Sequence, residues 1–391
     1  MSGTDRPALR GTDGETVRQA LESADPLPGT TGFAGETDGY LVRDVLGREP
    51  LFLETADGGS RDDPWAFEPD ALEDPVPFPA GGVLETPELA ATTAADDIGE
   101  RWTLPAPAPE PDPDTALEAL DEALVTAIDA VPDGLEAAVA FSGGVDSALV
   151  AELLDAPLYV VGFPDSHDVE AARTAAAAMG RELTVVELEP ADLERAVPEI
   201  ARATGRTNAM DIQIALPLYL VGEQVAADGF DALAVGQGAD ELFGGYEKVV
   251  RLDHRVEAET TRGAVREQIR SLPAQLPRDV LSIRATDLEP VAPLLHDAVV
   301  DAALRLPDDL LADEATRKRG FRRVARQYLP EEVAERDKKA VQYGSLVARE
   351  LDRLARQAGY KRRMDDHVTK YVASLLPDVE TPVPVGDSGS G

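Results

Sequence analysis

The sequence has no cysteine, only four histidines, few aromatic residues and no long apolar run. Without cysteine, the chain cannot form disulfides, cysteine-ligated zinc sites, iron–sulfur clusters or a thiolate nucleophile. The histidines are His167, His254, His296 and His367, and no two of them have the spacing of metal ligands. No apolar run approaches the roughly 18 residues of a membrane span, and the first residues contain neither an apolar stretch nor a basic leader. We therefore expect a cytoplasmic protein that does not enter a membrane.

Basic residues are also scarce, because 37 lysines and arginines stand against 74 acidic residues, a formal net charge of −37. One interpretation is that the charge repels nucleic acid and favours a basic partner. The other is adaptation to high salt, where an acidic surface stays hydrated and dissolved ions screen its self-repulsion. The acidic residues are spread along the whole chain rather than gathered in one tail, which favours the second interpretation. We expect folding and activity at high salt.

A proline-rich, acidic stretch divides the chain into two regions of different character. In the first region, short apolar runs alternate with glycine and proline after a weak helix at 16–23, which predicts short β-strands in a small meander. The second region begins with an amphipathic stretch that Thr115 is expected to cap as a helix. We predict a β-rich domain at 1–102, a linker at 103–114, a second domain at 115–376 and a disordered tail at 377–391.

The second region alternates short apolar runs with helical segments, which predicts an α/β fold with a doubly wound parallel sheet. The predicted strands are 136–141, 157–162, 182–188 and 231–235. The predicted helices are one that follows Asp146 and those at 168–179, 191–204 and 211–228. From Tyr246 onward almost every segment has a helical pattern, so we expect a helical subdomain that covers the sheet edge.

A glycine-rich turn, AVAFSGGVDSALV, joins the first predicted strand of the sheet to its helix. Ser142, Gly143 and Gly144 have little or no side chain, so backbone N–H groups can converge on an anion at the helix N-terminus. Ser147 adds a hydroxyl donor, and Asp146 adds a carboxylate suited to Mg²⁺. An ordinary tight turn would also contain glycine, but the strand before and the helix after it favour a phosphate site at the carboxyl end of the sheet.

A second loop, GQGADELFGGY at 236–246, follows the last predicted strand and therefore lies at the same edge. The carboxylate of Asp240 can meet that of Asp146 across a shared Mg²⁺ and offset the charge of a departing pyrophosphate. Acidic residues such as Asp240 and Glu241 are also common in the first turn of any helix. That simpler explanation does not account for the glycines on both sides.

The motif SGGVDS resembles the pyrophosphate-binding loop of the ATP-pyrophosphatases, which include asparagine, argininosuccinate, GMP and NAD synthetases and tRNA-modifying enzymes. The loop GQGADELFGGY narrows the resemblance to asparagine synthetases and β-lactam synthetases. Four further segments follow the family in order: YVVGFPDSHDVEAARTAAAAMG, TNAMDIQIALPLYLVGEQVA, RDVLSIRATDLEPVAPLLHD and YLPEEVAERDKKAVQYGS. The resemblance covers most of 115–351 and implies a fold like that of the adenine nucleotide alpha hydrolases.

The resemblance also implies roles for individual residues, with ATP as substrate and Mg²⁺ as cofactor. By register, Lys338 would neutralise the α-phosphate, with Lys339 as the alternate, and the backbone at Val161 and Gly162 would meet the adenine. The implied nucleotide-binding residues are Ala140, Ser142, Gly143, Gly144, Asp146, Ser147, Val161, Gly162, Gly236 and Gln237. The implied catalytic residues are Lys338, Asp240 and Glu241, and the implied metal ligands are Asp146 and Asp240.

The N-terminal region resembles only part of the glutaminase domain with which family members usually start. LVRDVLGREPLFLE and WAFEPDALEDPVPFPAGGVLE resemble its later strands, but its opening strands and cysteine nucleophile have no counterpart. We expect a truncated, cysteine-less remnant of a class II glutamine amidotransferase, which cannot hydrolyse glutamine. Such a remnant is expected to act as scaffold, dimer contact or docking surface. From the acidic composition we expect a haloarchaeal type.

Two residues depart from the pattern of the family. Gln237 stands where many relatives carry an acid, and a neutral amide cannot act as a general base. Val291 stands where relatives usually have arginine. Either change could alter the substrate or the nucleophile while leaving the adenylation step intact.

The resemblance implies an AMP-forming ligase that adenylates a carboxylate, by resemblance aspartate, and transfers it to ammonia with release of pyrophosphate. An alternative is amide formation on another small acid with an amine from a partner protein, which Gln237 and Val291 favour. A non-catalytic ATP or AMP sensor would not require Asp146, Asp240 and Lys338 together. Modification of tRNA would need a basic, aromatic-containing stripe, which the sequence lacks. The expected partners are small molecules, a second copy of the chain or an amine-supplying protein, and neither nucleic acid nor membrane.

Overall fold

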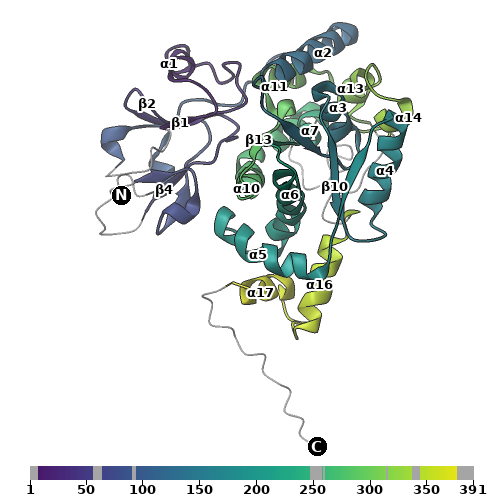
Figure 1. The fold of residues 1–391 in the computed structure, drawn as a ribbon. Helices are drawn as coiled ribbons and strands as arrows, with labels where there is room; N and C mark the ends of the chain where they lie inside the picture. Colours follow the sequence, from purple (N-terminus) through teal and green to yellow (C-terminus); the bar gives the residue numbers. More distant parts are fainter. Residues whose placement is uncertain are drawn as a thin grey trace, which may run out of the picture.

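The computed structural model describes residues 8–55, 64–89, 94–246, 258, 260–313, 316–336 and 344–376. Figure 1 shows a small β-rich N-terminal part beside a larger part in which helices surround a parallel sheet. We call residues 8–102 the N-terminal part and residues 113–376 the α/β part. Among the described residues, no helix combines the length and apolar character needed to cross a membrane.

The N-terminal part contains two antiparallel sheets rather than one meander. One sheet has the order β1-β2-β3-β7-β8 and the other the order β5-β4-β6. The strands are β1 (Leu9–Arg10), β2 (Ala34–Thr37), β3 (Tyr40–Arg43), β4 (Phe52–Glu54), β5 (Trp65–Ala66), β6 (Pro75–Pro77), β7 (Gly82–Glu85) and β8 (Gly99–Glu100). The predicted early helix is present as α1 (Gly14–Ser23), because the Asp13 carboxylate accepts a hydrogen bond from Thr16 N at 2.9 Å.

The first helix of the α/β part, α2 (Pro113–Asp129), begins earlier than the sequence predicted. Its N-cap is Asp112 and not Thr115, because the Asp112 carboxylate accepts from Asp114 N at 3.1 Å and from the Thr115 hydroxyl at 3.2 Å. Pro113 occupies the first turn, where its fixed φ suits a helix and its missing N–H costs nothing. The preceding proline-rich stretch is held by Arg266, which donates to the carbonyls of Leu104 and Pro105.

Five parallel strands form the central sheet of the α/β part, which confirms the predicted fold class. They hydrogen-bond in the order β11-β10-β9-β12-β13. The strands are β9 (Ala137–Ala140), β10 (Leu158–Gly162), β11 (Leu183–Glu187), β12 (Ala232–Ala234) and β13 (Glu289–Val291). The first strand of this sheet in chain order, β9, lies in its middle. The chain adds β10 and β11 on one side of β9 and then β12 and β13 on the other. Open sheets of this kind bind ligands where the strand order reverses, which here is at the carboxyl ends of β9 and β12.

The helices cover both faces of the sheet (Figure 1). Val139 and Val160 pack into one core with α3 (Val145–Leu154) and α4 (His167–Met179). Their neighbours Ala138 and Val161 pack into a second core with α5 (Pro190–Thr204) and α6 (Ala209–Ala227). Successive strand residues point to opposite faces, so one sheet separates two apolar cores.

The described chain after Tyr246 is mostly helical, as predicted, and strand β13 is an exception to that pattern. Its three residues pair with β12 and extend the sheet at the edge that a helical subdomain was expected to cover. The segment is too short for a periodic signal, and it contains Pro290, which an edge strand tolerates because one side needs no N–H donors. The short helix α7 (Ala239–Phe243) lies in the acidic loop, before Tyr246. Among the described residues, the α-helices after Tyr246 are α9 (Thr261–Ile269), α10 (Leu272–Arg284), α11 (Asp297–Arg305), α12 (Asp308–Leu311), α13 (Arg319–Ala325), α14 (Glu331–Ala334), α16 (Val347–Gln357) and α17 (His367–Ser374). The predicted tail at 377–391 lies outside the described residues.

Candidate active site

A cavity of about 510 Å³ opens at the carboxyl ends of β9 and β12. Both loops that the sequence singled out contribute to its wall, together with α6, α10 and residues around the start of α13. Its lining includes ten predicted site residues: Ala140, Ser142, Gly144, Asp146, Ser147, Val161, Gly236, Gln237, Asp240 and Glu241. The topology of the sheet therefore brings together residues that are far apart in the sequence.

The turn after β9 is built as an anion-binding loop. It leads into the ten-residue helix α3, whose N-cap is Gly144, so unpaired N–H groups and the positive end of the helix dipole lie at this turn. Ser142 N donates to Ser147 Oγ at 3.2 Å, which closes the turn. Gly143 has φ +72°, and a Cβ there would lie 2.6 Å from the carbonyl oxygen of Ala171. Only glycine fits this position without displacing α4.

The acidic loop after β12 lies directly against the anion-binding turn. A Cβ at Gly236 would lie 2.8 Å from Asp146 Cβ and 2.9 Å from Ser147 N, so the absence of a side chain permits this approach. Gly238 adopts φ +87° and starts the short helix α7, which carries Asp240 and Glu241. The glycines that sequence analysis could not explain as part of a plain helix start thus serve close approach and a left-handed turn.

A lysine that sequence analysis missed joins the two loops. Lys318 Nζ lies 2.8 Å from both carboxylate oxygens of Asp146 and 2.7 Å from Asp240 Oδ1. The Lys318 side chain is 7% exposed. Burial alone would lower its pKa, but Asp146 and Asp240 outweigh burial and raise the pKa above its ordinary value. Lys318 therefore remains protonated near neutral pH. The one available signal was the basic run RKRGFRR at 317–323 in a strongly acidic chain.

The remaining predicted site residues lie at varied positions. Gly143 and Gly162 are not among the described residues that line the cavity. A Cβ at Gly162 would lie 2.6 Å from Ser166 Oγ, so this glycine permits the packing of β10 against the start of α4. Lys338 and its alternate Lys339 lie outside the described residues. Arg336 lines the cavity, and its guanidinium donates to the carbonyl of Ala171 at 2.7 Å.

The two acidic residues of α7 have different environments. The Asp240 side chain is 48% exposed and contacts Lys318. Glu241 is buried and accepts a hydrogen bond from the hydroxyl of Tyr246. Burial raises the pKa of Glu241, and the hydrogen bond from Tyr246 only partly offsets this. Of the two acidic residues of α7, Asp240 is thus the one that contacts the Lys318 ammonium together with Asp146.

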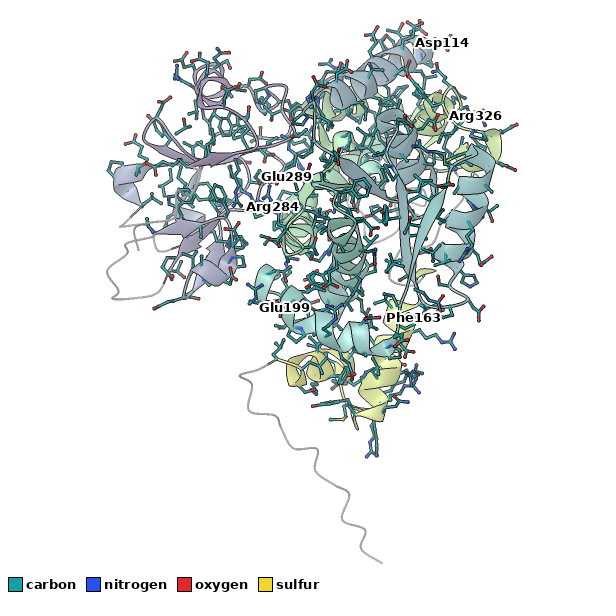
Figure 2. The ribbon with its side chains drawn as sticks, in the orientation of Figure 1. Asp114, Phe163, Glu199, Arg284, Glu289 and Arg326 are labelled. Atoms are coloured by element: carbon teal, nitrogen blue, oxygen red, sulfur yellow. The ribbon has the colours of Figure 1, made fainter. Side chains whose placement is uncertain are left out.

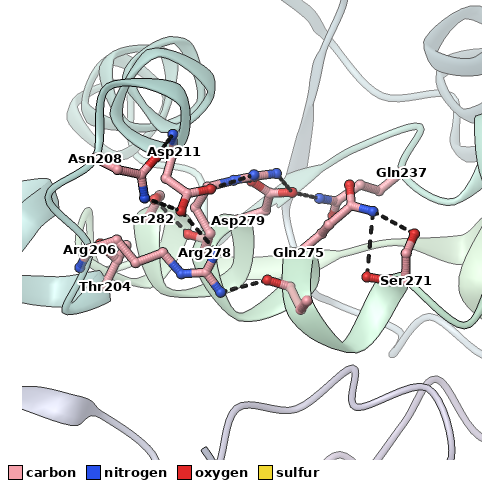
Figure 3. Close-up of polar contacts among 11 residues, drawn as sticks. Thr204, Arg206, Asn208, Asp211, Gln237, Ser271, Gln275, Arg278, Asp279 and Ser282 are labelled. Carbon is pink, nitrogen blue, oxygen red and sulfur yellow. Dashed lines mark hydrogen bonds and ion pairs between the residues drawn. The ribbon is translucent and has the colours of Figure 1, made fainter. Parts of the chain in front are cut away.

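Gln237 is anchored by a buried charge network (Figure 3). Its amide Nε2 donates to Asp279 Oδ2. Arg278 brackets the same carboxylate, with 2.6 Å from Nε to Oδ1 and 2.9 Å from its second nitrogen to Oδ2. Arg278 also donates to Asp211 Oδ1 at 3.0 Å. Burial raises the pKa of Asp279, although Arg278 opposes the shift. An amide at position 237 can donate to this carboxylate, whereas an ionised acid there would repel it.

Val291, the second departure from the pattern, belongs to the sheet. It is a buried residue of β13, and its carbonyl accepts from Val235 N at 2.9 Å. Val291 is not among the described residues that line the cavity. The Val291 side chain packs into the apolar core that also contains Leu242 and Phe243 of α7.

The donor set at the mouth of the cavity fits Mg²⁺. Asp146 and Asp240 supply carboxylate oxygens, which this ion prefers, and Mg²⁺ completes its shell with water and phosphate oxygens. Both carboxylates already contact one cationic group, the ammonium of Lys318. Within the described ranges no three acidic or histidine side chains form a complete metal cage.

The sequence was compared with known proteins. Residues 119–279 and 253–378 match the sequence model of the family described as asparagine synthase. This chain belongs to the asparagine synthase family. Membership agrees with the order of loops around the cavity, and the matched residues include both of them.

Named relatives agree with this family. The chain is 30% identical over 302 residues to the putative asparagine synthetase [glutamine-hydrolyzing] 1 of Methanocaldococcus jannaschii, covering 67% of this chain and 56% of the relative. It is 24% identical over 355 residues to asparagine synthetase B [glutamine-hydrolyzing] of Escherichia coli, covering 81% and 61%. The chain thus spans 56% and 61% of the length of these two asparagine synthase family members.

A search of solved structures found a U34-tRNA thiolase, NcsA, from Methanococcus maripaludis with its [4Fe-4S] cluster. The sequence identity is 13% and the TM-score is 0.29, over 71% of this chain and 84% of the thiolase. At this level of similarity the thiolase adds nothing to the assignment of this asparagine synthase family member.

Proposed function

We propose that this protein is an ATP-dependent, AMP-forming ligase that adenylates a carboxylate and transfers it to ammonia. Family membership supports aspartate as the acid and asparagine as the product. The observation that carries the proposal is the ammonium of Lys318 between Asp146 and Asp240, beside an anion-binding turn in a cavity of about 510 Å³. Helix N-terminal N–H groups and a fixed cation are the groups that stabilise the charge that develops on phosphate oxygens during ATP cleavage.

The adenylation step has suitable groups in the cavity. The turn at Ser142–Gly144 holds the pyrophosphate portion of ATP at the start of α3. The substrate carboxylate attacks the α-phosphorus, and the P–O bond to pyrophosphate breaks. Protonated Lys318 lies where it can neutralise charge on the departing pyrophosphate. The amine then attacks the acyl carbon, loses a proton and displaces AMP.

Mg²⁺ would be held by Asp146 and Asp240 and would supply charge neutralisation on the phosphate oxygens. Lys318 contacts both of these carboxylates, so it would share them with the ion. Lys338 is the proposed partner of the α-phosphate.

The nitrogen donor is proposed to be free ammonia. The chain contains no cysteine, so it cannot attack a glutamine amide with a thiolate as a glutaminase domain does. The N-terminal part is accordingly assigned a structural role rather than a hydrolytic one.

A second candidate is amide formation on another small acid with an amine from a partner protein. Two observations favour it. Gln237 is a neutral amide, which cannot accept a proton as a carboxylate would, and Val291 is buried in the core. The two candidates share the adenylation step and differ only in the acid and the amine.

The test is pyrophosphate release by the purified chain in molar KCl with ATP and Mg²⁺. We expect release that depends on aspartate, and asparagine formed from ammonium but not from glutamine. If no pyrophosphate is released with aspartate but pyrophosphate is released with another carboxylate, the second candidate is favoured. Binding of ATP with no release for any acid in a carboxylate screen would overturn the ligase proposal and leave a nucleotide sensor.

A further inference from the structure

A buried ionic cluster joins the N-terminal part to the segment that precedes α11. Arg48 Nε donates to Asp44 Oδ1 at 2.8 Å, and a terminal nitrogen of Arg48 lies 2.7 Å from Asp297 Oδ1. The other oxygen of Asp297 accepts from Gly29 N at 3.0 Å and Thr30 N at 2.8 Å. The cluster therefore ties both ends of the 29–48 segment to the first residue of α11.

The three charged side chains of the cluster are almost completely shielded from water. Arg48, Asp44 and Asp297 are 4%, 0% and 1% exposed. Burial would lower the pKa of Arg48, but Asp297 and Asp44 reverse the effect and raise it. A buried pair of this kind tolerates the loss of one partner poorly, because the other charge is left without compensation. The junction is consequently a rigid connection rather than a loose surface contact.

The same guanidinium extends toward the active site. It donates to the carbonyl oxygen of Leu295 at 2.7 Å. The side chain of Leu295 lies against Gly238, and a methyl group added at Gly238 would overlap it. Gly238 begins α7, which carries Asp240 at the mouth of the cavity. Two successive contacts and the first turn of α7 thus connect the N-terminal part to a proposed metal ligand.

We propose that Arg48 is a positioning residue for the ligase reaction, and that the N-terminal part sets the acidic loop through Leu295. This inference rests on the proposed function. It gives the N-terminal part a defined task in catalysis: Arg48 fixes the backbone of Leu295, and Leu295 fixes the position from which α7 presents Asp240 to Lys318 and the nucleotide. A displacement of about 1 Å at such a site is enough to slow a reaction strongly.

The adjacent residue provides a matched control. Glu49 forms a bidentate ion pair with Arg284, the last residue of α10. The two terminal nitrogens of Arg284 donate to the two carboxylate oxygens of Glu49 at 2.8 and 3.1 Å. Figure 2 shows Arg284 and its second partner Glu289 on the side of the α/β part that faces the N-terminal part. Glu49 and Arg48 thus hold the same two parts together, but Arg48 also contacts the segment that packs on the acidic loop.

The experiment compares Arg48→Lys with Glu49→Gln in the full chain in molar KCl. Lysine keeps the charge but lacks the planar guanidinium with its several N–H donors, so it cannot contact Asp44, Asp297 and the Leu295 carbonyl at the same time. We expect Arg48→Lys to lower kcat for pyrophosphate release by about tenfold or more with little change in the KM for ATP. We expect Glu49→Gln to retain kcat. Hydrogen exchange should accelerate at residues 236–244 in Arg48→Lys and remain unchanged there in Glu49→Gln.

The exchange measurement does not depend on turnover, so it separates this inference from the proposed function. If the unmodified chain releases no pyrophosphate, the ligase proposal fails, and exchange at 236–244 still decides the role of Arg48. Should Arg48→Lys fail to fold, Leu295→Ala leaves the ionic cluster intact and is expected to give the same local acceleration and loss of kcat. Equal effects of Arg48→Lys and Glu49→Gln on kcat and exchange, or no effect of Leu295→Ala, would overturn the proposal.

Discussion

Replacement of Lys318 by methionine tests the centre of the proposed site. Methionine keeps most of the side-chain volume but removes the ammonium that contacts Asp146 at 2.8 Å and Asp240 at 2.7 Å. The two carboxylates then face each other without a counter-charge. Loss of one group that stabilises developing charge in a transition state typically costs roughly 10²–10³ in kcat. We expect a decrease of this size in pyrophosphate release.

The same substitution has a second, metal-dependent consequence. Breaking a fully buried ion pair costs ~3–5 kcal/mol. Asp240 is half exposed, so water can solvate its carboxylate after the ammonium is removed. We therefore expect a smaller loss, roughly 1–3 kcal/mol, in the free energy of unfolding. Mg²⁺ prefers carboxylate oxygens, so it should restore part of this loss in the variant. It should stabilise the unmodified chain less, because Lys318 already occupies both carboxylates.

The assay is chemical denaturation in molar KCl with either EDTA or MgCl₂, alongside pyrophosphate release. Lys370→Met is the matched control, because Lys370 is an exposed lysine of α17 and its replacement should change neither quantity. Pyrophosphate release by Lys318→Met at the rate of the unmodified chain would refute the role of the ammonium. Equal stabilisation of both chains by Mg²⁺ would refute the shared use of the two carboxylates.

Three further predictions concern other parts of the molecule. Asp240→Asn should leave ATP binding, measured by calorimetry, nearly unchanged but abolish pyrophosphate release. A variant that still releases pyrophosphate would refute the assignment of Asp240 as a metal ligand. Gln237→Glu should replace the amide that donates to Asp279 with a group of like charge. The free energy of unfolding should therefore fall by roughly 1–3 kcal/mol. An unchanged denaturation midpoint would contradict the network of Figure 3. Hydrogen bonds from Arg362 and His367 lower the pKa of Asp352 to about 2, so its contribution to stability should be present above the unfolded pKa of about 3.9 and be lost as pH falls toward about 2. Asp352→Asn should weaken that acid dependence in denaturation at pH 2 to 5.

Much of the fold follows from local pattern. The inner strands β10 and β12 are apolar runs in the sequence because both of their faces are buried, and the helices between the strands are periodic segments. Strand β13 escaped prediction because three residues carry no period and their pairing with β12 depends on the rest of the sheet. The sequence analysis placed the cap of α2 at Thr115, but the helix begins at Pro113 with Asp112 as its N-cap, because proline suits the first turn of a helix.

The placement of the candidate site was predictable in part. Parallel strands end at one edge of a sheet, so a loop after β9 and a loop after β12 had to lie close together. Sequence alone therefore determined that Asp146 and Asp240 would share a site, and that a glycine-rich turn would present N–H groups there.

Only the tertiary structure decided which side chains complete that site. Lys318 lies 172 residues from Asp146 in the sequence, and Asp279 lies 42 residues from Gln237. No periodic pattern relates such positions, because a side chain finds its partner only after the helices have packed. A buried charge must be paired when water is removed, so folding selected these partners among many exposed charges of the same kind. Local pattern thus determined the sheet and its loops, and desolvation in the packed structure determined the ion pairs between them.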